Sequence, residues 1–61
     1  RDDRPFDGTH VVAKGETLWA LALRYEVRPE TLAERNGMAL DAVIREGQAL
    51  KVPILDSGTP F

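Results

Sequence analysis

Apolar residues follow two different periods along the chain, and the change of period divides it into separate elements. The segment His10-Val11-Val12-Ala13 is β-branched at its centre and stops at Lys14-Gly15. This pattern predicts a short strand with Val12 and His10 on its inward side. From residue 18 the apolar positions recur at intervals of three and four, which is the spacing of one face of a helix. These positions are Leu18, Leu21, Ala22 and Tyr25.

Residues with capping chemistry mark the ends of two helices. Thr17 can accept a hydrogen bond from a free N–H group of the first helix, and Glu16 places a carboxylate near the positive end of that helix. Pro29 suits the first position of a second helix. That helix is expected to end at Asn36-Gly37, because glycine adopts the left-handed conformation of a helix end without strain.

A second strand is predicted at Ala49-Leu50-Lys51-Val52, where apolar residues alternate before Pro53. A single strand leaves its backbone groups unpaired, so the two strands are expected to pair, and the helical connection favours an antiparallel arrangement. The predicted fold class is therefore α+β, with a βααβ order, a two-stranded antiparallel sheet and both helices packed on one face. The expected core is Val12, Leu18, Leu21, Ala22, Tyr25, Leu32, Ile44, Leu50 and Val52.

Both ends of the chain have the composition of linkers. Residues 1–8 are largely polar and include Pro5 and Gly8, and the segment Asp56-Ser57-Gly58-Thr59-Pro60 is rich in turn-forming residues. We therefore expect an N-terminal linker at residues 1–8, one folded domain at residues 9–54 and a C-terminal linker at residues 55–61.

Composition and charge exclude several classes of function. The 61 residues contain no cysteine and one histidine, so neither a disulfide framework nor a metal site is expected. The formal net charge of -2 gives no positive field for nucleic acid or anionic lipid. No apolar run approaches the roughly 20 residues of a membrane span. The lone serine, Ser57, lies in the tail with no histidine near it in the sequence, so catalysis is not expected. A neutral partner and no cofactor are the expectation.

Three short motifs occur in order between His10 and Pro53. They are a turn that enters the first helix, an Asn-Gly pair at the end of the second helix, and a closing strand: Gly15-Glu16-Thr17-Leu18-Trp19, Asn36-Gly37 and Gly47-Gln48-Ala49-Leu50-Lys51-Val52-Pro53. Together with single matches at Val12, Leu21-Ala22, Tyr25, Val27, Leu32 and Ile44, they resemble a lysin-motif (LysM) domain. The resemblance covers most of the chain.

The resemblance implies a carbohydrate-binding module that recognises glycans containing N-acetylglucosamine, either bacterial peptidoglycan or chitin. The glycan is expected in a shallow groove between the loop after the first strand and the loop before the second. By position, the implied contacts are Gly15, Glu16, Thr17, Leu18, Ala42, Val43, Ile44 and Arg45. It further implies a monomeric module, excised from a cell-wall hydrolase or another cell-wall protein, in an extracytoplasmic, wall-associated location that is periplasmic or secreted.

The chain departs from the family pattern at three positions. Glu16 stands where the family usually has aspartate, Arg28 where a serine often caps the second helix, and Glu46 where a proline usually precedes Gly47-Gln48. Glu16 keeps the charge, whereas Arg28 is expected to weaken the helix cap by about 0.5–2 kcal/mol. Without the proline, the loop beside the expected groove is predicted to be less stiff.

Other interpretations remain open from the sequence. Two short helices around a break also fit a DNA-binding helix-turn-helix, but the second helix carries two carboxylates against one arginine, which opposes phosphate contact. The same fold could instead serve protein interaction or assembly, with a weak or lost sugar site. Trp19 lies one position off the main apolar stripe. We therefore expect partial burial against the second strand or a tail rather than a sugar-stacking role.

Overall fold

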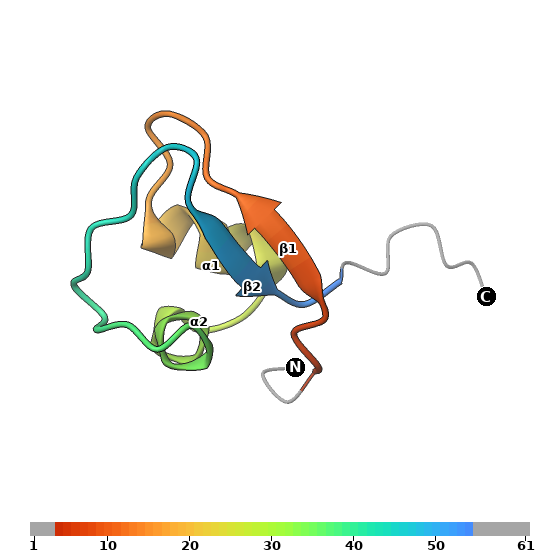
Figure 1. Cartoon of the computed structure of the whole chain (residues 1–61). Helices are drawn as coiled ribbons and strands as arrows, with labels where there is room; N and C mark the ends of the chain where they lie inside the picture. Colours follow the sequence, from red (N-terminus) through yellow and green to blue (C-terminus); the bar gives the residue numbers. More distant parts are fainter. Residues whose placement is uncertain (1–3, 55–61) are drawn as a thin grey trace.

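The computed structural model describes residues 4–54, which form a two-stranded antiparallel sheet covered on one side by two helices (Figure 1). The elements follow the predicted order: strand β1 (Gly8–Val11), helix α1 (Leu18–Tyr25), helix α2 (Pro29–Arg35) and strand β2 (Ala49–Val52). The predicted α+β class and its βααβ order are therefore confirmed. Among the residues described, no helix is long and apolar enough to span a membrane.

Strand β1 begins and ends two residues earlier than the sequence predicted. It pairs with β2 from Gly8 opposite Val52 to Val11 opposite Ala49. Ala13 instead opens a turn, because its carbonyl accepts a hydrogen bond from the Glu16 amide at 3.1 Å. The expected strand at residues 10–13 was wrong because the limits of a strand depend on its partner and not only on local propensity.

Both helices begin and end where their capping residues predict. The Thr17 hydroxyl accepts a hydrogen bond from the Ala20 amide, and Pro29 occupies the first turn of α2. Arg28 is the residue before α2, and its side chain makes no capping hydrogen bond, as its substitution for serine implies. Beyond the end of α2, Gly37 has a φ of 66°, which glycine adopts without the strain that other residues incur.

The core lies between the sheet and the helices. Every residue of the predicted core is buried except Ile44, which is partly buried and packs against the edge of the cluster. The buried side chains also include Val27, Ala33 and Pro53, which the sequence analysis did not assign to the core.

The side chain of Asn36 joins the end of α2 to the outer edge of β2. Its Nδ2 donates to the carbonyl oxygens of Leu32 and Lys51, each at 2.9 Å, and its Oδ1 accepts from the Lys51 amide at 2.7 Å. Both Lys51 backbone groups therefore find partners on the side of β2 that faces away from β1. The side-chain amide of Asn36 therefore makes the two hydrogen bonds to Lys51 that a neighbouring strand would otherwise make.

Residues 4–7, placed in the expected linker, contact the folded part of the chain. Arg4 donates from Nη2 to the carbonyl oxygens of Tyr25, at 2.5 Å, and Glu26, at 3.2 Å. Phe6 packs against the core, and the Arg35 guanidinium lies over its ring with a centroid distance of 4.6 Å. These contacts fasten the segment to the C-terminal ends of α1 and α2. The domain limits themselves stay a prediction, and the expected linker at residues 55–61 lies outside the described residues.

Candidate functional site

A groove of about 310 Å³ lies at the N-terminal end of α1. Its first wall is residues 16–19, from the turn that enters α1 and the first turn of the helix. Its second wall is residues 40–44, from the long connection between α2 and β2. Most of the lining side chains are apolar, and the polar ones are Glu16, Thr17 and Asp41. A hollow of this kind suits a ligand with an apolar face and a few polar groups.

A tight turn at residues 13–16 shapes the first wall. The Glu16 amide donates to the Ala13 carbonyl, and Gly15, the third residue, has a φ of 84°. These are features of a type II turn, in which the third residue favours glycine. Leu18 is 3% exposed and closes the base of the groove from inside the core. The first wall is therefore held both by its own turn and by core packing.

The carboxylate of Glu16 points back from the wall into a hydrogen-bonded network. Its Oε1 accepts from the Ala13 amide at 2.6 Å and lies 2.8 Å from Nε2 of His10. These hydrogen bonds, chiefly the one from the Ala13 backbone and then the one from His10, lower the pKa of the Glu16 carboxyl. Glu16 lies directly before the Thr17 cap at the N-terminal end of α1, and its carboxylate is also hydrogen-bonded within the turn.

A second turn, at residues 45–48, leads from the second wall into β2. The Gln48 amide donates to the Arg45 carbonyl at 3.0 Å, and the Gln48 side chain accepts from the Arg45 amide at 3.0 Å. Gly47 has a φ of 90° at the third position, so this turn has the same form as the first. The loop is closed by hydrogen bonds even though Glu46 replaces the stiffening proline.

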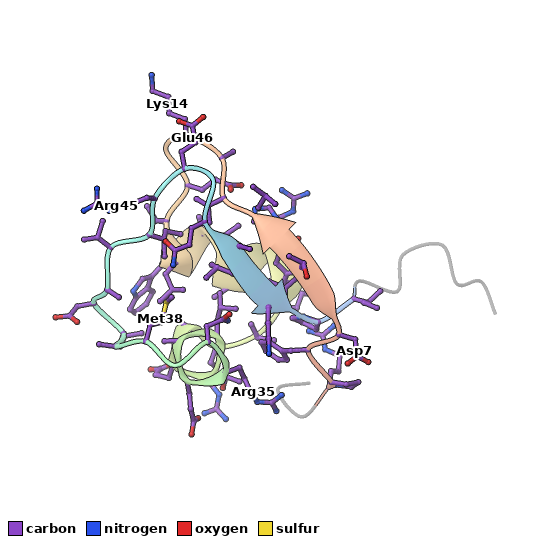
Figure 2. All side chains as sticks on the ribbon, viewed as in Figure 1. Asp7, Lys14, Arg35, Met38, Arg45 and Glu46 are labelled. Carbon is purple, nitrogen blue, oxygen red and sulfur yellow. The ribbon has the colours of Figure 1, made fainter. Side chains whose placement is uncertain are left out.

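Backbone hydrogen bonds join the two turns to each other. The Val12 amide donates to the Gln48 carbonyl and the Gly47 amide donates to the Val12 carbonyl, each at 2.8 Å. Lys14 and Glu46 project from the tips of the turns at the same end of the molecule (Figure 2). The sheet ladder thus continues past β1 and fixes the spacing of the two segments that lead into the groove.

The structure brings together most of the residues that the sequence analysis assigned to the site. Glu16, Thr17 and Leu18 line the first wall, and the second wall includes Ala42, Val43 and Ile44. Gly15 and Arg45 do not line the groove. Gly15 lies in the turn before the first wall, and the exposed side chain of Arg45 extends into solvent (Figure 2).

Three further residues line the groove that the sequence analysis did not place there: Trp19, Leu40 and Asp41. Trp19 is 59% exposed, so the expected partial burial was wrong. Trp19 lies one position off the apolar stripe, and this position alone does not indicate whether the indole packs against another part of the chain or stays exposed. Leu40 and Asp41 lie in an irregular loop and carried no periodic signal.

Trp19 also borders a second hollow, of about 410 Å³, on the outer surface of α1. Its other lining residues are all apolar: Ala20, Ala22, Leu23, Val27 and Pro29. The indole therefore separates the groove from this neighbouring apolar surface. Within residues 4–54, no group of acidic or histidine side chains is arranged to hold a metal ion.

Known proteins resemble the chain in both sequence and fold. The model of the LysM domain family matches residues 10–53. Among solved structures, the Bacillus cereus spore cortex-lytic enzyme SleL is similar, with a TM-score of 0.71 and 31% sequence identity. The likeness covers 74% of this chain and 10% of the SleL chain, so it concerns one small part of that enzyme. No curated protein gives a match.

Proposed function

Because the chain belongs to the LysM domain family, we propose that it is a non-catalytic carbohydrate-binding module for glycans that contain N-acetylglucosamine. The observation that carries the proposal is the groove between residues 16–19 and 40–44. The groove overlaps the two loops, at residues 15–18 and 42–45, in which the family resemblance leads us to expect the glycan, and this overlap supports the proposal. A lining of mainly apolar side chains with few charges suits an uncharged sugar.

The chemistry of the groove matches the groups that an N-acetylhexosamine presents. The sugar is uncharged and offers hydroxyls, an amide and a methyl group, so it needs hydrogen-bond partners beside a small apolar pocket. Leu18 and Ile44 form the apolar base, and the exposed indole of Trp19 offers a flat face for the C–H surface of a sugar ring. Thr17 and the backbone of the second wall supply polar groups at the rim.

The chemistry of the groove and the similarity to SleL both support a cell-wall role. SleL is by name a spore cortex-lytic enzyme, which supports a setting in a bacterial wall. We propose that the module anchors an attached domain to the wall as a monomer, in a periplasmic or secreted location. Bacterial peptidoglycan is the favoured ligand, with chitin as the alternative.

A titration followed by NMR tests the proposal. Tetra-N-acetylchitotetraose and muramidase-released peptidoglycan fragments are added separately to the labelled chain. We expect amide shifts confined to residues 16–19 and 40–44, and dissociation constants between about 1 μM and 1 mM. Affinity for tetra-N-acetylchitotetraose should change little between low and high salt, because this ligand carries no charge to screen. If neither ligand shifts these amides, the module is not a glycan binder and the protein-interaction alternative is favoured.

Two matched substitutions on α1 locate the contact. Trp19→Ala removes an exposed aromatic side chain that lines the groove, and Leu23→Ala removes an aliphatic side chain that is 81% exposed and lies outside the groove. We expect Trp19→Ala to weaken binding about tenfold, equal to about 1.4 kcal/mol, and Leu23→Ala to leave it unchanged. Equal effects of the two substitutions would place the glycan outside the groove.

A further inference from the structure

The side chain of His10 connects the core to the first wall of the groove. Its Nδ1 lies 2.9 Å from the Tyr25 hydroxyl, and its Nε2 lies 2.8 Å from Oε1 of Glu16. The rings of His10 and Tyr25 meet edge to face, with centroids 5.7 Å apart. Tyr25 is buried and the His10 side chain is 13% exposed, so this chain of contacts runs from inside the protein to the turn at residues 13–16.

The length of the Glu16 side chain makes this connection possible. One oxygen accepts from both the Ala13 amide and His10, which lie on different sides of the turn. An aspartate is shorter by one methylene, about 1.5 Å, and a carboxylate drawn back by that distance would not keep both contacts. Glu16, at a position where the family usually has aspartate, is therefore long enough to reach both the Ala13 amide and His10.

We propose that Glu16 and His10 are positioning residues for the glycan, which hold the first wall in its binding shape, and that the module releases its ligand when the Glu16 carboxylate takes up a proton. This inference rests on the proposed function. It changes the role expected for Glu16, from a direct contact with the sugar to a support of the turn that carries Thr17 and Leu18.

The charges around Glu16 determine how the contact responds to pH. His10 faces it from β1, the Ala13 amide from the turn, and Arg24 from α1, with Nη1 4.0 Å from Oε2. A neutral imidazole can donate from Nε2 while Nδ1 accepts from Tyr25, and a protonated imidazole donates from both nitrogens. Charging His10 therefore keeps the contact. Protonation of Glu16 removes the charge that strengthens both bonds, and because its pKa is lowered this occurs only in more acidic solution.

The test compares binding of tetra-N-acetylchitotetraose across pH in the parent chain and in four variants. Glu16→Gln should bind about three- to tenfold more weakly at neutral pH, as expected when a charge-assisted hydrogen bond is lost. Its affinity should then stay constant as the solution is acidified. The parent should fall to the level of Glu16→Gln once the carboxylate is protonated. Glu34→Gln, on the exposed side of α2, is the matched control and should follow the parent at every pH.

Variants at His10 separate positioning from direct contact. His10 does not line the groove, so a direct sugar contact by Glu16 would leave His10→Phe binding as the parent does. Under the proposal His10→Phe binds more weakly and loses affinity at a higher pH, because one of the causes that lowers the Glu16 pKa is gone. His10→Gln keeps an N–H donor for Glu16 and should recover most of the affinity. Circular dichroism confirms that each variant is folded.

Two outcomes would overturn the inference and are distinct from failure of the proposed function. If the parent binds and His10→Phe, shown to be folded, binds equally well, His10 has no positioning role. If the Ala13 amide shift reports protonation of Glu16 while affinity stays constant, the carboxylate does not support the site. If the parent binds no glycan at any pH, the proposed function fails and the positioning role fails with it.

Discussion

Replacing Asn36 by aspartate tests whether one side chain holds α2 against β2. The two side chains have nearly the same shape, so Asn36→Asp keeps the packing and changes the hydrogen bonds and the charge. The new carboxylate still accepts from the Lys51 amide, but it loses the two donations, to the carbonyl oxygens of Leu32 and Lys51. It also places a negative charge beside those two oxygens.

The two lost hydrogen bonds determine how much stability Asn36→Asp is expected to remove. Each net hydrogen bond contributes about 0.5–1.5 kcal/mol, so losing two costs about 1–3 kcal/mol, and repulsion from the carbonyl oxygens adds to this. A chain of 61 residues has a total stability of about 3–9 kcal/mol, at about 0.05–0.15 kcal/mol per residue. The substitution should therefore remove a large share of the stability at neutral pH. Part should return in acid, where the protonated carboxyl regains a proton to donate.

Urea denaturation followed by far-UV circular dichroism measures the effect. Ala39→Asp adds the same charge at an exposed loop position outside the groove and should change the free energy of unfolding by less than about 0.5 kcal/mol. Both variants are compared with the parent at pH 7 and in acid. If Asn36→Asp unfolds at the urea midpoint of the parent, the side-chain amide does not stabilise the edge of β2 and the reasoning is refuted.

Three further predictions concern stability. Leu21 is 1% exposed, so Leu21→Ala should lower the free energy of unfolding by about 2–5 kcal/mol, whereas Leu23→Ala, at an exposed position of the same helix, should cost less than about 0.5 kcal/mol in the same urea assay. Glu46→Pro should raise it by about 0.4–1 kcal/mol, since proline suits the second position of a type II turn, and a loss of stability would contradict that turn geometry. The lowered pKa of Glu16 stabilises the fold above the pKa of its unfolded state, and this contribution disappears as the pH falls through the folded value. Urea denaturation between pH 7 and 3 should therefore show that the free energy of unfolding falls less on acidification in Glu16→Gln than in the parent. An equal fall in both proteins would exclude this contribution.

The sequence predicted the helices well because their ends depend on neighbouring residues. Thr17 caps α1 through its own hydroxyl, and Pro29 starts α2 through its fixed backbone angle, so neither needs a distant partner. The limits of β1 were predicted less well, because pairing as far as Gly8 depends on β2, more than forty residues away.

The candidate site was predicted where the family motifs cover it and missed where distant parts of the chain meet. The motif that enters α1 indicated Thr17 and Leu18 in the first wall. The exposure of Trp19 depends on the course of the irregular loop at residues 39–44, which has no hydrophobic period to read. The contact between Glu16 and His10 depends on how closely β1 approaches the turn, and spacing along the sequence does not give that distance.

The pairing of Gly8 with Val52 places both ends of the folded part on one side of the molecule. The groove borders the first turn of α1, whereas Arg4 contacts the carbonyl at its last residue, so the two features are separated by an eight-residue helix of about 12 Å. The described part of the chain therefore begins and ends on the side of the molecule away from the groove. If the module binds glycan as proposed, copies joined through these ends would leave each groove open, and linked copies on one polymer would gain about 10²–10⁴ in avidity. Each copy would then dissociate and rebind singly while the other copies keep the protein on the polymer.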